Sequence, residues 1–197
     1  MQASSIAFPV GKKIFWQGYY TESDGGGNWG VVKSGTPIDD GGSILTLTAG
    51  KYIKANLTSR INTRKFGTKS DATQQEVRIQ AVIDYIEANE DGGTVVIDGL
   101  YKCHGIKVLK NNITIDGVGY AGLLYRNDGN SDWIVDVELN AGVNDRIFNI
   151  DKLRIAGNTL AVTERGLKLQ NMYGNSRIDV LFLGLQTCCF TGDVYGA

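Results

Sequence analysis

Residues 66–119 read FGTKSDATQQEVRIQAVIDYIEANEDGGTVVIDGLYKCHGIKVLKNNITIDGVG, and this stretch decides the fold class. Four apolar residues in it recur at the i, i+3, i+4 and i+7 spacing of one helix face, namely Ile79, Val82, Ile83 and Ile86. A capping box at Thr73–Glu76 predicts the helix start, and Asn89 with Gly92-Gly93 predicts its end. A helix of about 15 residues cannot bury this stripe alone, so it must lie on another apolar surface.

Short β-type runs follow the helix at intervals near 20 residues. The longer runs are 94–97, 112–115, 133–137, 152–155 and 177–181, and the shorter ones are 106–108, 123–125, 146–148 and 166–169. With Val95, Ile113, Ile134, Leu153 and Ile178 taken as equivalent positions, the steps are 18, 21, 19 and 25 residues. This recurrence predicts a solenoid of stacked coils, with the helix covering the open end of the first coil. A β-sandwich would also have short, regularly spaced strands, and an α+β domain could hold one packed helix.

Composition excludes several function classes. The chain has 197 residues, 42% of them hydrophobic, so it is long and apolar enough to bury a sizeable core. It has 26 Gly and only 2 Pro, so its turns are expected to be formed by Gly and Asn. A net charge of −1 gives no electrostatic footprint for nucleic acid, and no apolar run is long enough for a membrane span. The N-terminus lacks the pattern of a signal peptide. The three cysteines, which include the adjacent Cys188-Cys189, are expected to pack as small apolar side chains in a reduced interior.

The first part of the chain has a different organisation. Residues 1–57 contain aromatic and apolar runs separated by the turn signals 23–28 and 39–42, which predicts a small all-β module of four or five strands. The predicted organisation is therefore an N-terminal β module over 1–57, a connecting neck over 58–72, and a helix with the first solenoid coils over 73–197.

The chain resembles the start of bacteriophage tailspikes and capsule depolymerases with a pectate-lyase-like β-helix. The resemblance rests on an Asp-Asp-Gly-Gly turn, Phe-Gly, Ile-Gln-Ala with Ile-Asp, Gly-Gly-Thr-Val and Gly-Val-Gly, and it covers residues 18 to about 125. Where the family has acidic residues before the helix, this chain has Ser70 and Gln74-Gln75. The resemblance implies a mainly β fold: an N-terminal anchor, a capping α-helix and the first coils of a right-handed parallel β-helix.

The resemblance also implies a function. The chain would be the N-terminal part of a homotrimeric tailspike, bound through its first module to a phage tail or adaptor protein. Its β-helix would bind and depolymerise host capsular or O-antigen polysaccharide. Such a protein is made in the host cytoplasm and ends in the virion. A non-catalytic structural or adhesin subunit on the same scaffold is the alternative, since a fold does not fix a function. A cellular pectate-lyase-like enzyme is a weaker third possibility.

Two motifs point to chemistries that their context does not support. Residues 117–122, GVGYAG, match a dinucleotide fingerprint, but a strand-like run follows where that fingerprint needs a helix. His104 is the only histidine and has no second cluster of ligands at metal-binding spacing. We therefore expect no cofactor and no metal, and we read His104 as a turn residue near the first coil.

Depolymerisation would require paired carboxylates, or a base beside a group that neutralises a uronate. The candidate acids are Asp132, Asp136, Glu138, Asp145, Asp151, Glu164, Asp179 and Asp193. Residue parity puts Asp136 on the face of Ile134, which would be costly if that face is interior. Sugar rings could stack on aromatic side chains at Trp133, Tyr125 and Tyr173. The sequence nominates no catalytic residue among these.

The chain stays apolar and coil-like up to its last residues, and no polar cap of a terminal solenoid repeat is visible. We therefore expect the 197 residues to be the beginning of a longer protein. In related tailspikes the polysaccharide groove lies farther along the β-helix, so this part would mainly anchor and trimerise.

Overall fold

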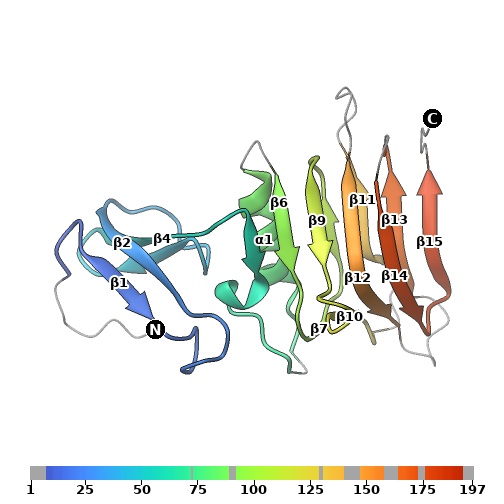
Figure 1. The fold of residues 1–197 in the computed structure, drawn as a ribbon, viewed down its shortest axis with the longest axis horizontal. Coiled ribbons are helices and arrows are strands. Elements are labelled where there is room, and N and C mark those ends of the chain that lie inside the picture. The colour runs from blue at the N-terminus through green and yellow to red at the C-terminus, as the bar shows by residue number, and fades with distance from the viewer. Residues whose placement is uncertain are drawn as a thin grey trace.

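The computed structural model describes residues 8–71, 73–88, 92–128, 131–139, 147–157, 164–172 and 176–192. Figure 1 shows a small sheet at one end, the helix α1 beside it, and a stack of strands that continues toward the C-terminus. Parallel pairing connects the strands of this stack, whereas the N-terminal sheet is antiparallel. The predicted mainly β fold, with a capping helix and parallel β-helix coils, is confirmed.

The N-terminal sheet has the strand order β1-β2-β4-β3. Its strands are β1 (Lys13–Trp16), β2 (Asn28–Ser34), β3 (Ile44–Leu47) and β4 (Lys51–Ala55). The carboxylate of Asp40 fixes the turn before β3, because it accepts the backbone N–H groups of Gly42 and Ser43 at 2.9 and 2.7 Å. Asp24 does the same before β2, where it accepts the N–H groups of four residues. Both predicted turn signals therefore act through Asp side chains that bind their own loops.

The β-helix follows a linking strand, β5 (Arg60–Asn62), and a 3₁₀ turn, η1 (Thr63–Phe66). The helix α1 spans Glu76–Glu87. The coil strands are β6 (Gly93–Val96), β7 (Leu100–Lys102), β8 (Ile106–Val108), β9 (Ile113–Asp116), β10 (Leu123–Tyr125), β11 (Trp133–Glu138), β12 (Phe148–Ala156), β13 (Arg165–Gln170), β14 (Ile178–Leu183) and β15 (Thr187–Gly192). These strands make up four coils. The first two coils have three separate strands each, whereas in the last two coils the long strands β12 and β14 each take the place of two strands.

Three faces result from the parallel pairing, and each face stacks like residues in columns. On the first face the inward column is Ile61, Val95, Ile115, Ile150 and Ile178. On the second it is Tyr101, Leu124, Ile155 and Phe182. On the third it is Ile106, Val135, Leu167 and Cys189. Most of these side chains are fully buried, so the columns form one continuous apolar core.

The predicted register was wrong in its details. Val95 pairs with Ile115, Ile115 with Ile150 and Ile150 with Ile178, so the intervals between stacked residues are unequal and differ from the predicted steps. Ile134, taken as equivalent to Val95, lies in β11 on the third face. The strands of all three faces have similar apolar sequences, and the connections between them differ in length. The spacing of apolar runs in the sequence therefore could not show which face each strand belongs to.

β12 is one continuous strand that turns a corner of the coil. Its first half pairs with β9 and its second half with β10, with a register irregularity between Ile150 and Leu153. Lys152 has φ +52° at this corner. The positive φ lets the strand change direction without a loop, at a conformational cost that tertiary packing must offset.

The helix α1 covers the edges of the first coil, as predicted. The amide of Gln80 accepts the Lys107 N–H at 2.8 Å and donates to the Lys107 carbonyl at 3.0 Å, so it replaces a neighbouring strand along β8. The carboxylate of Glu87 accepts the N–H of Leu109 at 2.7 Å. On β7 the backbone N–H of Gln75 donates to the carbonyl of Lys102 at 2.9 Å. Together with β5, which pairs with β6, these contacts satisfy edge groups that would otherwise invite aggregation.

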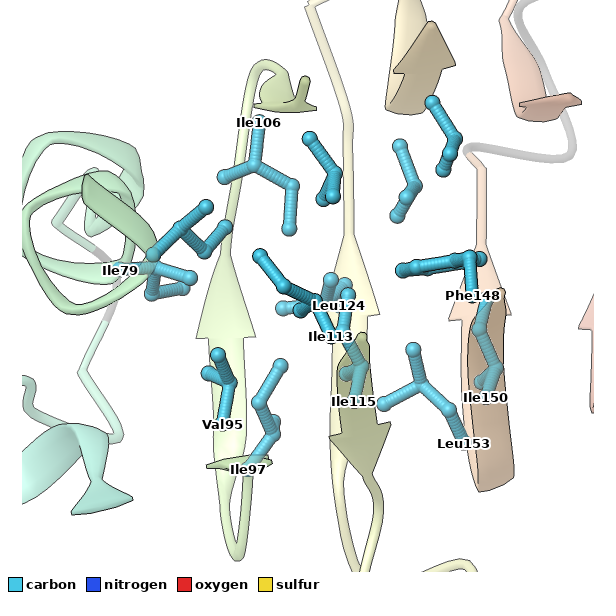
Figure 2. Close-up of a cluster of buried hydrophobic side chains, with 14 of the residues drawn as sticks. Ile79, Val95, Ile97, Ile106, Ile113, Ile115, Leu124, Phe148, Ile150 and Leu153 are labelled. Carbon is cyan, nitrogen blue, oxygen red and sulfur yellow. The ribbon is translucent and has the colours of Figure 1, made fainter. Parts of the chain in front are cut away.

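The apolar stripe of α1 is confirmed, with Ile79, Val82, Ile83 and Ile86 all buried against the first coil. Figure 2 shows Ile79 directed from the helix toward the side chains inside the coils.

The predicted capping box was wrong. The N-cap residue is Gln75, which makes no side-chain cap hydrogen bond. Its buried side chain instead accepts the Lys69 N–H at 3.0 Å and donates to the Thr73 carbonyl at 3.1 Å. Gln75 therefore organises the loop before the helix, and Thr73 lies in that loop. The helix ends at Glu87, and Asn89 lies outside the described residues.

The cysteines correct another expectation. Cys103 is fully buried, as expected, but Cys188 and Cys189 are exposed. Cys189 is in register with the buried Leu167, yet among the described residues no strand stacks on the far side of β15. Within the described part of the chain, no helix is long and apolar enough to cross a membrane.

Candidate functional site

A ladder of charged side chains runs along the outside of the third face. Lys107, Asp136 and Lys168 are in register on β8, β11 and β13. The Lys168 Nζ lies 3.3 Å from the Asp136 Oδ1. The prediction that put Asp136 on the face of Ile134 was wrong. Ile134 and Val135 are both fully buried at the corner where β11 begins, so parity counted from Ile134 fails and Asp136 faces outward.

A groove of about 370 Å³ lies between the start of β8 and the start of β11. Its lining residues are His104, Gly105, Ile106, Lys107, Asp132, Trp133 and Asp136. Gly105 has φ +146°, a conformation that favours glycine, and a Cβ there would make a tight contact of 3.0 Å with the Trp133 carbonyl oxygen of the next coil. Two of the predicted candidate acids and one predicted stacking aromatic are thus brought together in one depression.

His104 is held at the edge of this groove. Its Nδ1 lies 3.2 Å from the Asp128 Oδ2 and 2.7 Å from the Gln74 amide nitrogen. Asp128 in turn accepts from Arg126, whose Nε donates to it at 2.6 Å. Arg126 is 2% exposed and also donates to the Asp132 carbonyl at 2.9 Å. A buried, charge-paired arginine therefore binds both the Asp128 side chain and the Asp132 backbone.

Trp133 forms the aromatic side of the groove. The guanidinium carbon of Arg165 lies 5.6 Å from the centre of its ring, within the range of a cation–π contact. Arg165 is the register partner of Trp133 on β13, whereas β8 and the groove lie on the other side of β11. This arrangement places the indole between the exposed guanidinium of Arg165 and the depression.

The other candidate acids are placed elsewhere. Asp151 and Asp179 both lie 3.5 Å from the same Arg177 nitrogen, so the two carboxylates share one guanidinium. The hydroxyl of Tyr120 donates to Asp179, and this contact raises the pKa of the tyrosine. This cluster lies on a different part of the surface from the groove, and the bridging Arg177 neutralises part of its charge.

Of the remaining candidates, only Glu138, Glu164 and Tyr125 belong to the described residues. Glu138 is exposed and Glu164 is fully buried. Asp145, Asp193 and Tyr173 lie outside the described residues. Tyr125 is half-buried in β10, on the second face.

The dinucleotide-like motif and His104 both lie in connections between strands. Residues 117–122 connect β9 to the strand β10, with positive φ at Val118, Gly119 and Tyr120, so no helix N-terminus is present there to bind a pyrophosphate. Cys103, beside His104, is buried and points inward, and burial raises the pKa of its thiol to about 12. In the described ranges, no group of three or more His, Cys, Asp or Glu side chains is arranged to hold a metal ion.

The sequence pattern did not single out Lys107, Lys168, Arg126 or Asp128. Outward parity on strands would have suggested the lysines, but only once the register between coils was known. Arg126 and Asp128 follow β10 immediately, and nothing in their spacing shows that Asp128 meets a histidine of the preceding coil.

Stacked coils, an N-terminal helix cap and an antiparallel sheet before them define a tailspike-like parallel β-helix, and comparison with solved structures agrees. A glycan biofilm modifying enzyme of Pantoea stewartii, WceF, which has a tailspike-like parallel β-helix fold, superimposes with a TM-score of 0.64 at 19% identity over 95% of this chain. Full-length tailspike protein 2 of an Escherichia coli O157:H7 bacteriophage superimposes with a TM-score of 0.55 at 14% identity over 98% of this chain. The enzymatically active domain of tailspike protein 2 of bacteriophage CBA120 gives 0.55 at 14% identity over 96%.

These likenesses are of the fold. The chain spans about a third of each of these structures, with 31%, 31% and 34% of their lengths covered. No protein-family profile matches the chain, and no curated protein matches its sequence.

Proposed function

We propose that these 197 residues are the N-terminal part of a phage tailspike. Residues 1–57 attach to a tail or adaptor protein, residues 58–72 connect, and residues 73–197 start a trimeric β-helix that binds host capsular or O-antigen polysaccharide. In this proposal the complete protein depolymerises the glycan and is a component of the virion tail, made in the host cytoplasm.

The observation that carries the proposal is the order of parts. An antiparallel sheet, a helix that covers the first coil, and stacked parallel coils follow one another along the chain, and the phage tailspike protein 2 has the same fold over 98% of it. The polar groove on the third face supports glycan binding, because an aromatic ring with hydrogen-bonding and charged groups beside it suits a sugar.

The anchoring role has its own support in the N-terminal sheet. Phe15 on β1 is 74% exposed and stacks on Trp29 of β2 at 6.2 Å between ring centres. Aromatic residues are enriched at protein interfaces, so this exposed pair suits contact with another protein better than contact with water alone.

Two measurements test the proposal. The complete protein is incubated with capsular polysaccharides, and binding, released reducing ends and 4,5-unsaturated uronates are measured. We expect binding and shortening of at least one polymer. Binding without any shortening would favour the non-catalytic adhesin, and the absence of both would overturn the glycan role. Mass measured in solution tests the trimer, and a stable monomer would contradict it.

A further inference from the structure

We propose that the groove between β8 and β11 is a subsite for one carboxylate-bearing sugar unit, with the sugar ring on Trp133 and its carboxylate on Lys107. This inference rests on the proposed function, because it specifies which part of a glycan the first coils recognise.

The size of the groove limits the ligand. A cavity of about 370 Å³ is at the small end of the range for ligand pockets, so it accommodates one or two sugar units of a chain that continues along the surface. The depression is partly open to solvent, and its lining comes from two adjacent strands of one face and the residues that precede them. A polymer could therefore enter from the side without a change in the backbone.

The aromatic side is preorganised. Trp133 is half-buried, which limits the motion of the indole, and the guanidinium of Arg165 lies beside its ring. Stacking on a rigid aromatic ring requires little additional loss of side-chain freedom, which favours binding of a flat apolar sugar face.

Of the described residues that line the groove, Lys107 carries the one ammonium group, and the groove also holds the carboxylates of Asp132 and Asp136. Asp136 is already paired with Lys168, whereas no described residue forms an ion pair or hydrogen bond with the ammonium group of Lys107. Lys107 is exposed and is in register with Asp136 on the neighbouring strand, so its flexible stem can extend over the groove. An ammonium group without a described protein partner can bind the carboxylate of a sugar whose ring lies on Trp133, and this arrangement suits a uronate or another carboxylate-bearing sugar better than a neutral one.

His104 completes the recognition of hydroxyl groups. Contacts to Asp128 and Gln74 hold its imidazole at the edge of the groove, and those two residues lie on different elements, so the ring orientation does not depend on the ligand. Asp132 supplies a carboxylate at the same edge, which suits the hydroxyl donors of a sugar.

The test uses the chain described here and two probes of equal length, a trimer of galacturonate and a neutral trimer of glucose. Binding is measured by saturation-transfer NMR and by titration calorimetry. We expect the galacturonate trimer alone to bind, and we expect high salt to weaken it. Lys107→Gln should weaken binding by about tenfold, and Lys107→Arg should largely preserve it. The matched control is Lys33→Gln, which alters an exposed lysine of β2 in the N-terminal sheet and should change nothing.

Trp133→Ala should also weaken binding by about tenfold, and Trp133→Phe should recover part of it. Since Lys107 is exposed, its variant keeps the fold and remains decisive even if the Trp133→Ala variant is unstable. Equal binding of the neutral and acidic trimers, or unchanged binding by Lys107→Gln, would overturn the subsite.

The subsite and the proposed function fail in distinguishable ways. If host polysaccharide binds the chain but Lys107→Gln and Trp133→Ala are without effect, the groove is not the subsite and the tailspike function stands. If the complete protein neither binds nor shortens any host polysaccharide, the glycan function itself is wrong, and the subsite falls with it.

Discussion

Gly42 lies against the ring of Phe66, and a Cβ at residue 42 would be 2.4 Å from two of the ring carbons. Phe66 is 1% exposed and its ring lies 6.2 Å from that of Tyr85 in α1. The glycine of the Asp-Asp-Gly-Gly turn therefore packs the N-terminal sheet onto the residue that precedes the β-helix. The Asp-Asp-Gly-Gly turn and the Phe-Gly motif therefore touch each other, although two strands and the linker separate them in the sequence.

The first prediction concerns this contact. Gly42→Ala should destabilise the protein by about 1–3 kcal/mol, because the added methyl group overlaps a buried ring in a packed site. Gly42 does not have a positive φ, so the effect comes from the contact and not from the backbone. Urea unfolding measures it. Phe66→Leu combined with Gly42→Ala should recover part of the loss, and strict additivity of the two changes would contradict the direct contact.

The second prediction concerns Asp98, which connects the linker to the first coil. Its carboxylate accepts from Arg64 at 2.9 Å, Asn62 at 2.9 Å and Tyr101 at 3.0 Å. Burial alone would raise the pKa of Asp98, but these hydrogen bonds outweigh it and hold the pKa below its usual value. A lowered folded-state pKa stabilises the protein above the unfolded pKa of about 3.9, and this contribution is lost as the pH falls through the folded value.

Asp98→Asn should therefore cost about 1–2 kcal/mol at pH 7 and flatten the decline of stability below pH 4. Thermal unfolding from pH 7 to pH 2.5 measures both effects. The control is Glu22→Gln, which alters an exposed carboxyl of the N-terminal part and should leave the curve unchanged. An Asp98→Asn curve parallel to that of the unchanged protein would disprove the linkage.

How much of this structure follows from sequence depends on the range of the interaction. The helix stripe at Ile79–Ile86 and the Asp40 turn are local, so spacing and composition predicted them. The stacking of Val95 on Ile115 and then on Ile150 is not local, because it depends on connections of unequal length between similar strands.

The groove was unpredictable for the same reason. Lys107 and Asp136 belong to successive coils and meet only through the pairing of β8 with β11. Gln75 shows a different limit: its amide binds the preceding loop instead of capping the helix, and propensity rules do not anticipate a tertiary contact of this kind.

The third prediction concerns the thiols. Cys103 is fully buried and its pKa is raised to about 12, whereas Cys188 is exposed. A thiol reagent at pH 8 should label Cys188 rapidly in the folded chain. The Cys189 residue is exposed, but partial burial of its thiol raises the pKa, so it should react more slowly than Cys188. Cys103 should react only after unfolding. Mass spectrometry of the labelled peptides measures the order. Labelling of Cys103 at the rate of Cys188 would contradict the buried position.

The last prediction tests the helix as the cover of the first coil. Ile79 is fully buried against the coil, whereas Val77 on the same helix is 78% exposed. Ile79→Ala removes methyl groups from a packed core and should cost about 2–4 kcal/mol, while Val77→Ala should change the free energy of unfolding by less than about 0.5 kcal/mol. Loosening of the cover would also expose the edges of β7 and β8, so Ile79→Ala should aggregate faster at moderate temperature. Urea unfolding and light scattering measure the two effects. Equal stability of the two variants would show that the coils do not depend on the helix.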